Sequence, residues 1–144
     1  MSTPEPAPRP GRIRQGDREK ALRPLPPEAR HRAFDDGLAC YARGDFFAAH
    51  EALEPAWMGT DDLPERELHQ GLIKLAAAYV HAVRGNPTGV RKNLVGARSH
   101  LALAEPAGRA WGVDVPRLLA DIDDRLADPA LAGEPPAIRR IVPA

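Results

Sequence analysis

Apolar residues recur at alternating spacings of four and three along much of the chain, and no other feature constrains the fold as strongly. The clearest rows are Leu68, Leu72, Leu75 and Tyr79, and Val90, Leu94, Ala97 and Leu101. This spacing brings the residues of each row onto one face of an α-helix. The chain has no sustained alternation of apolar and polar residues and no Asn-Gly turn, which are the signals of strands and hairpins. The sequence therefore predicts an all-α fold.

Glycine and proline residues divide these rows into short segments. The stretch Gly85–Pro87 is typical of the end of one helix and the capped start of the next. Pro106 and Gly108 are expected to break the fourth helix, and a shorter fifth helix is expected over about residues 115–126. Because the intervening loops are short, consecutive helices should be antiparallel neighbours. We therefore expect a small up-and-down helical bundle of about four to five helices.

The beginning of the chain differs in composition from the rest. Seven of the 16 prolines lie in residues 1–27, together with several arginines and almost no apolar side chains to bury. Such a segment cannot offset the entropy cost of becoming ordered. We expect residues 1–26 to form a flexible Pro/Arg-rich arm, residues 27–128 the helical bundle domain, and residues 129–144 a strapped or frayed C-terminal tail.

The formal net charge of zero is the sum of two unlike parts. Residues 1–32 hold eight basic and four acidic groups, whereas residues 33–144 hold 12 basic and 16 acidic groups. The arm is therefore either a solvated tail or a basic segment that contacts an acidic surface of its own body or of a neighbouring subunit. Excess apolar surface on the first or last helix would allow a homodimer. Because the whole chain lacks surplus positive charge, nucleic-acid binding is not expected.

Several classes of protein are disfavoured by simple counts. The single cysteine, Cys40, cannot form an intramolecular disulfide. The longest apolar run, residues 75–80, is far shorter than the roughly 20 residues of a membrane span, and the first residues lack the apolar stretch of a secretory signal. We therefore expect a cytoplasmic protein. Arginine outnumbers lysine by 17 to 3, which is typical of a GC-rich bacterium.

Polar residues fall in rows that should be buried, and these are the candidate functional residues. His50 lies in the apolar row of the second expected helix, and Glu54 follows it by one turn. Gln70 and His81 share a row of the third expected helix. If the two helices pack antiparallel, these side chains meet around Trp57 or Tyr79, and small residues at 71 and 76–78 let the helices approach closely or leave space for a ligand.

The stretch Gly44–Trp57 contains the pattern H-E-x-x-E-x-x-W and resembles the signature of a bacterial and archaeal helical family, domain of unknown function 309. Residues 70–81 and 84–89 are similar to its second and third blocks, so the resemblance covers about residues 34–103. It implies a small all-α domain and no established reaction. Pro55 departs from the family pattern and leaves the straightness of the second helix open. The matching positions are Phe46, His50, Glu51, Glu54, Trp57, Gln70, Gly71, His81, Asn86 and Gly89.

Three functions are compatible with this polar cluster. The first, which we expect, is a pocket between the second and third helices that binds a small ligand. The second is an internal hydrogen-bond network that only fixes the packing of the helices in an interaction or scaffold domain. The third is a metal-dependent, hydrolase-like enzyme in which His50, Glu54 and His81 hold a divalent metal and Glu51 acts as general base. The residues expected to bind the ligand are His50, Glu51, Glu54, Trp57, Gln70, His81 and Asn86.

The remaining polar candidates carry weaker signals. His31, His69 and His100 are expected at helix surfaces or ends, and Cys40 is expected to be a small core residue. The residues Arg91 and Lys92 follow the start of the fourth helix. Two interpretations are open for this helix start. Either the free backbone N–H groups and the two cations bind an anion, or the helix has an ordinary cap and both side chains are solvated.

Overall fold

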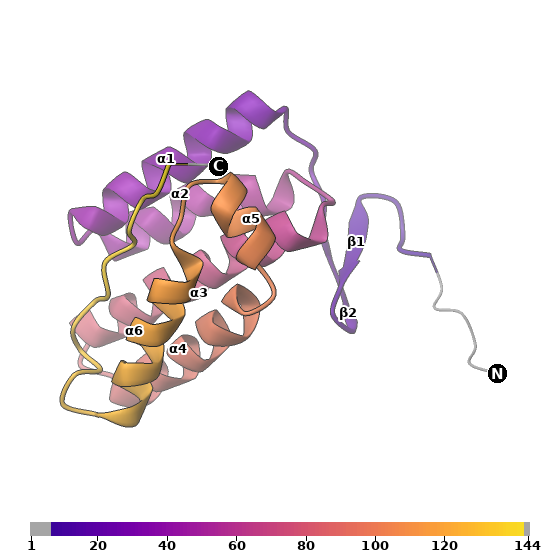
Figure 1. The fold of residues 1–144 in the computed structure, drawn as a ribbon. Coiled ribbons are helices and arrows are strands. Elements are labelled where there is room, and N and C mark those ends of the chain that lie inside the picture. Colours follow the sequence, from indigo (N-terminus) through magenta and orange to yellow (C-terminus); the bar gives the residue numbers. More distant parts are fainter. Residues whose placement is uncertain (1–6, 143–144) are drawn as a thin grey trace.

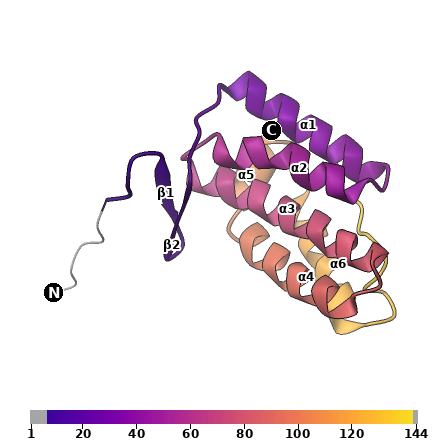
Figure 2. The same cartoon turned by 180° about the vertical axis from the view of Figure 1, so that it is seen from behind.

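The longest helix, α3 (Leu63–Val83), lies at the centre of the fold because helices on both sides bury its row of leucines. The computed structural model describes residues 7–142, which form six helices and one pair of strands. The other elements are β1 (Arg12–Gln15), β2 (Arg18–Ala21), α1 (Pro27–Ala42), α2 (Phe46–Met58), α4 (Pro87–Leu101), α5 (Glu105–Ala110) and α6 (Val115–Ala127). Figures 1 and 2 show α2 and α4 on opposite sides of α3, with α1 packed on α2 and α6 beside α4.

The prediction of a mostly helical bundle is confirmed, but the expected number of four to five helices was too low. The short helix α5 forms where Pro106 and Gly108 were expected only to break a helix. Pro106 stands in the first turn of α5, where a helix needs no N–H donor. Gly108 lets α5 pack on the start of α6, because a Cβ at this position would collide with Val115. Within residues 7–142, no helix combines the length and the apolar character needed to cross a membrane.

A polar side chain caps the N-terminus of three of the helices. Asp62, Asn86 and Asp114 each accept a hydrogen bond of 3.1 Å from the backbone N–H three residues later. These bonds satisfy N–H groups that have no partner within the helix, which explains why α3, α4 and α6 begin where they do. Asp45 occupies the corresponding position before α2 but makes no side-chain capping bond. The helix α2 continues through Pro55 to Met58.

The two strands correct the expectation that the chain has no β-structure. They pair antiparallel, and Gln15 opposite Arg18 leaves a two-residue turn at Gly16 and Asp17. Gly16 has a φ of +68°, a conformation that glycine adopts without strain, so the turn needs no Asn-Gly pair. The hairpin does not pack on the helices through an apolar face. It is attached through a buried polar residue, Gln15, and its sequence therefore lacks the alternation of apolar and polar residues that predicts a strand.

The C-terminal segment is strapped across the helices over the residues that the structure describes. The Tyr41 hydroxyl donates a hydrogen bond of 2.7 Å to the Pro136 carbonyl. The Tyr79 hydroxyl lies 3.1 Å from the carbonyl of Glu134, and Val113 pairs with Arg140 in an isolated β-bridge. Of the two states expected for this tail, the described part up to residue 142 therefore adopts the strapped one.

Candidate functional site

A pocket of about 230 Å³ lies between α2 and α3, at the place where the sequence brings polar residues onto facing rows. Its lining residues are His50, Glu54 and Trp57 from α2 and Gln70, Ile73, Lys74 and Ala77 from α3. We call this space the α2–α3 pocket. Four of the seven residues expected to bind a ligand line it, namely His50, Glu54, Trp57 and Gln70.

Two polar atoms on residues that line the α2–α3 pocket are buried without a hydrogen-bond partner. They are Nδ1 of His50 and Oε1 of Gln70. Buried polar atoms are nearly always paired in folded proteins, because an unpaired one costs about 1–3 kcal/mol. Glu54 and Lys74 line the same pocket, and within the described residues neither of them forms a salt bridge. The pocket therefore offers a carboxylate, an ammonium group, an imidazole and an amide that the protein itself leaves available.

The indole of Trp57 forms a fixed wall of the pocket. Its Nε1–H donates a hydrogen bond of 3.0 Å to Oε1 of Gln15, and the guanidinium of Arg66 lies 5.0 Å from its ring centroid. The N–H donor is thus already used, and Trp57 contributes a rigid apolar face. The stem of Lys74 packs over Gly96 of α4, where a Cβ would stand 3.6 Å from its Cδ. These contacts hold two of the lining side chains in place from outside the pocket.

His81, Asn86 and Glu51 lie outside the α2–α3 pocket. Nδ1 of His81 is 3.2 Å from Nδ2 of Asn86, and a Cβ on Gly89 would stand 2.5 Å from the His81 ring. His81 therefore packs on the first turn of α4, and Asn86 caps that helix. A smaller pocket of about 130 Å³ is lined by both His50 and His81. Glu51 is exposed and does not line the pocket.

The expected metal ligands do not form a metal-binding group. Throughout residues 7–142, no three or more His, Cys, Asp or Glu side chains are arranged so that they could hold a metal ion. The geometric reason is that His81 is turned toward the start of α4, where it contacts Asn86. The arrangement of His50, Glu54 and His81 therefore gives no support to a metal-dependent hydrolase.

A buried polar network that the sequence analysis missed joins the N-terminal hairpin to the helices. Arg66 is fully buried and donates hydrogen bonds of 2.8 to 3.3 Å to the carbonyls of Ala21, Trp57 and Thr60. Gln15 accepts from Nε of Arg66 at 3.3 Å and donates to Glu67 at 3.1 Å. The expectation that the arm has nothing to bury was therefore wrong for Gln15, which is 5% exposed.

Glu67 extends this network to α4. Nδ1 of His100 lies 2.6 Å from its carboxylate. Burial alone would raise the pKa of the Glu67 carboxyl, but the hydrogen bonds from His100 and Gln15 outweigh burial and lower this pKa below its ordinary value. His100 lies in the last turn of α4, at a helix end as expected, and is half-buried beside Glu67.

A second missed network lies under α1. Arg30 donates two hydrogen bonds, of 2.8 and 3.2 Å, to the Glu65 carboxylate, and Nε2 of His69 is 3.1 Å from the same group. The prediction that His69 lies at a surface was wrong, because it is completely buried against the rings of Phe34 and Trp111. The available signal was the spacing of four between Glu65 and His69, which places them on one helix face. His31 is exposed, as expected, and stacks on Trp111 at 3.9 Å.

The stability of the protein is expected to fall as the pH drops below about 6.5, the ordinary pKa of histidine. Burial lowers the pKa of His69 in the folded protein, and the Glu65 hydrogen bond offsets this only in part. Below pH 6.5 the unfolded chain therefore binds a proton that the folded chain does not. The resulting loss is at most about 1.4 kcal/mol per pH unit. Urea unfolding between about pH 8 and pH 5 measures it.

A His69→Phe variant provides the control, because a phenyl ring also suits the space between Phe34 and Trp111. This variant should lose the part of the pH slope that comes from His69. Equal slopes in the variant and the wild-type protein would contradict the assignment of this effect to His69.

A comparison with known protein families finds a match for the middle of the chain. A family with the description "Domain of unknown function (DUF309)" matches residues 34–93. The matched segment runs from within α1 into α4 and contains every residue that lines the α2–α3 pocket. None of the curated proteins matches the chain. This match supports the resemblance to domain of unknown function 309 that the H-E-x-x-E-x-x-W pattern implies.

Proposed function

We propose that the protein binds a small polar molecule in the α2–α3 pocket. The observation that carries this proposal is a pair of buried atoms without partners, Nδ1 of His50 and Oε1 of Gln70, on two residues that line one pocket. A ligand that hydrogen-bonds to both atoms removes the cost of leaving them unpaired. The volume of about 230 Å³ is below the range of about 300–1,000 Å³ for drug-sized ligands, so the ligand is small.

The charges of the pocket favour a zwitterion such as a free amino acid. The Glu54 carboxylate accepts hydrogen bonds and attracts a cation, and the Lys74 ammonium donates them and attracts an anion. The Gln70 oxygen requires a donor from the ligand, which an ammonium group supplies. The rigid face of Trp57 leaves room for a short apolar side chain. A molecule with an ammonium and a carboxylate matches these groups together.

The alternative of a purely structural network has less support. Among the described residues, no hydrogen bond joins any two of His50, Glu54, Gln70 and His81. A network that fixed the packing of α2 and α3 would need such hydrogen bonds, which Arg66 and Glu65 form elsewhere in the fold. The proposal therefore assigns packing to the Arg66 and Glu65 networks, and ligand binding to the α2–α3 pocket.

A thermal-shift screen with the free amino acids tests the proposal. A ligand present at ten times its Kd stabilises the folded state by about 1.4 kcal/mol, which raises Tm by several degrees. Gln70→Leu and Glu54→Gln should each weaken binding of the compound found by about tenfold, because each removes one hydrogen-bonding or charged partner.

Glu51→Gln is the matched control. Glu51 belongs to the same H-E-x-x-E pattern, but it is exposed and does not line the pocket. Its replacement should leave the affinity unchanged. Equal losses in Glu51→Gln and Glu54→Gln, or a screen in which no amino acid changes Tm, would contradict the proposal.

A further inference from the structure

A second and larger pocket, of about 550 Å³, lies between α4 and α6 and shares no residue with the α2–α3 pocket. Its volume is within the range typical of ligand sites. We call it the α4–α6 pocket. Its lining residues are Pro87, Thr88, Arg91, Lys92, Leu94, Val95, Arg125, Leu126, Pro129 and Ala132.

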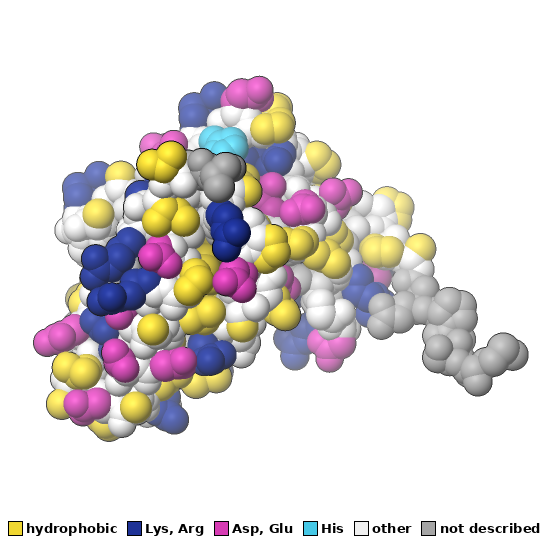
Figure 3. Space-filling model, viewed as in Figure 1, with side chains coloured by type: hydrophobic (Ala, Val, Ile, Leu, Met, Phe, Trp, Pro, Cys, Tyr) yellow, Lys and Arg dark blue, Asp and Glu magenta, His cyan; other side chains and the backbone are white. Residues whose placement is uncertain are grey.

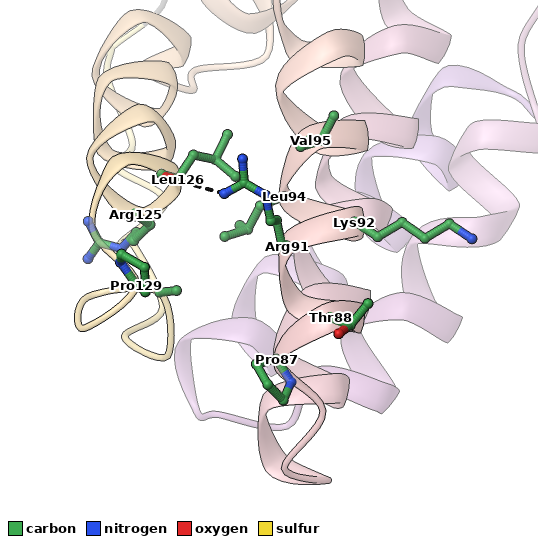
Figure 4. Close-up of a pocket in the computed structure, with 10 residues that line it drawn as sticks. Pro87, Thr88, Arg91, Lys92, Leu94, Val95, Arg125, Leu126 and Pro129 are labelled. Atoms are coloured by element: carbon green, nitrogen blue, oxygen red, sulfur yellow. Dashed lines mark hydrogen bonds between the residues drawn. The ribbon is translucent and has the colours of Figure 1, made fainter.

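The walls of the α4–α6 pocket are mostly apolar. Leu94 is fully buried at its base, and Leu126 faces it from α6 (Figure 4). Val95 remains 46% exposed, although it lies in the same wall. The two helices are joined here by a polar bridge, since Nη1 of Arg91 donates a hydrogen bond of 3.1 Å to the Leu126 carbonyl. The space beside this bridge is therefore open, apolar and suited to an aliphatic chain.

The charged residues of this lining are all basic. They are Arg91, Lys92 and Arg125, and no Asp or Glu of the described chain lines the pocket. Figure 4 shows the Arg91 guanidinium lying between the two helices, whereas the Lys92 side chain extends away from α6. Arg125 is held by the Glu134 carbonyl at 2.7 Å. Arg91 is therefore the cation best placed to meet a ligand inside the pocket.

The Arg91 guanidinium has more N–H donors than its hydrogen bond to Leu126 uses. It carries five N–H groups, and one of its nitrogens bonds to Leu126, which leaves others for a carboxylate. Two acidic side chains of α6 are paired elsewhere, Asp123 with Arg98 at 2.6 Å and Asp121 with Arg117 at 3.2 Å. Figure 3 shows acidic and basic side chains interspersed over the face that carries α6, so selection by charge would come from Arg91 and not from a broad basic surface.

We propose that the α4–α6 pocket binds a monomeric amphipathic anion, with its carboxylate on Arg91 and its aliphatic chain against Leu94 and Leu126. The apolar wall accounts for the chain, and the exclusively basic lining accounts for the negative head group. The same chemistry occurs in a free fatty acid and at the surface of an anionic membrane. Because the pocket is a bounded space of about 550 Å³, we assign it to the free molecule.

Calorimetric titration of the full chain with dodecanoate, below its micelle concentration, tests this proposal. Saturable binding is expected, and dodecyltrimethylammonium, which has the same chain and the opposite charge, should bind at least about tenfold more weakly. Arg91→Gln should weaken dodecanoate binding by about tenfold or more, because it removes a charge-assisted contact. Arg98→Gln is the matched control, since this exposed arginine is on the same helix and outside the pocket.

A second variant fills the pocket and keeps Arg91. Thr88 is exposed at its edge, so Thr88→Trp should abolish dodecanoate binding without loss of folding. Unchanged affinity in Arg91→Gln, equal binding of the cationic amphiphile, or no binding of dodecanoate would each overturn the proposal. Sedimentation of the protein with anionic phospholipid vesicles, without binding of the monomer, would overturn it in favour of a membrane surface.

Discussion

Replacing Arg66 with leucine is expected to lower the free energy of unfolding by about 3 to 5 kcal/mol. Arg66 is 0% exposed and supplies the hydrogen-bond donors for the carbonyls of Ala21, Trp57 and Thr60. Leucine removes all of these donors at once and takes away the cation that lies over the Trp57 ring. Because Gln15 also loses its bond to Arg66, the hairpin should loosen together with the start of α3. Urea unfolding measures the loss.

Two further variants test whether this loss comes from the burial of Arg66 and from its planar array of donors. Arg98→Leu breaks a 2.6 Å ion pair with Asp123 in which both side chains are nearly half exposed, and it should cost less than about 1 kcal/mol. Arg66→Lys keeps the charge but not the planar array of donors, so its loss should be intermediate. A loss below about 1 kcal/mol for Arg66→Leu would contradict the role assigned to this network.

Replacing Gly71 with valine is expected to cost about 3 kcal/mol, because α3 packs closely against Leu101 of α4 there. A Cβ at Gly71 would stand 2.6 Å from Cγ of Leu101 and 3.3 Å from its backbone nitrogen. Leu101 is completely buried and has no space into which to move. Gly71 thus serves the contact between α3 and α4, and it does not enlarge the α2–α3 pocket. Thermal and urea unfolding measure the cost.

Gly96→Ala is the control on the facing helix. The nearest atoms to a Cβ at Gly96 belong to the flexible Lys74 side chain at 3.6 Å, which is an ordinary contact. Alanine should therefore stabilise α4 by up to about 1 kcal/mol through its higher helix propensity. Opposite signs for the two glycines are the expected result, and a neutral Gly71→Val would contradict the close contact with Leu101.

Periodicity was sufficient to predict the longer helices, though not α5, and one part of the candidate site. The apolar rows of α3 and α4 follow from local sequence. So do the caps at Asp62 and Asn86, because each capping bond joins residues three apart. His50 and Gln70 could be placed in one pocket since α2 and α3 are consecutive helices joined by a short loop. Ligand binding by these residues stays a prediction.

The remaining features depend on contacts between distant residues. Gln15 meets Glu67 52 positions later in the chain, and no spacing rule relates them. The hairpin lacks an apolar face, so its sequence carries no strand pattern. Arg66 would be predicted at the surface, because buried arginines are rare. The position of His81 depends on how α3 meets the start of α4, which places its ring over Gly89. Sequence patterns therefore predict which face a residue occupies better than they predict its partner.

The most direct test of ligand binding is a crystal structure of the full chain soaked with free amino acids. The account predicts one amino acid in the α2–α3 pocket, with its atoms within hydrogen-bond distance of Nδ1 of His50 and Oε1 of Gln70. Its ammonium and carboxylate should lie toward Glu54 and Lys74 respectively. A pocket that holds only water, or one in which His50, Glu54 and Gln70 bond directly to one another, would contradict the account.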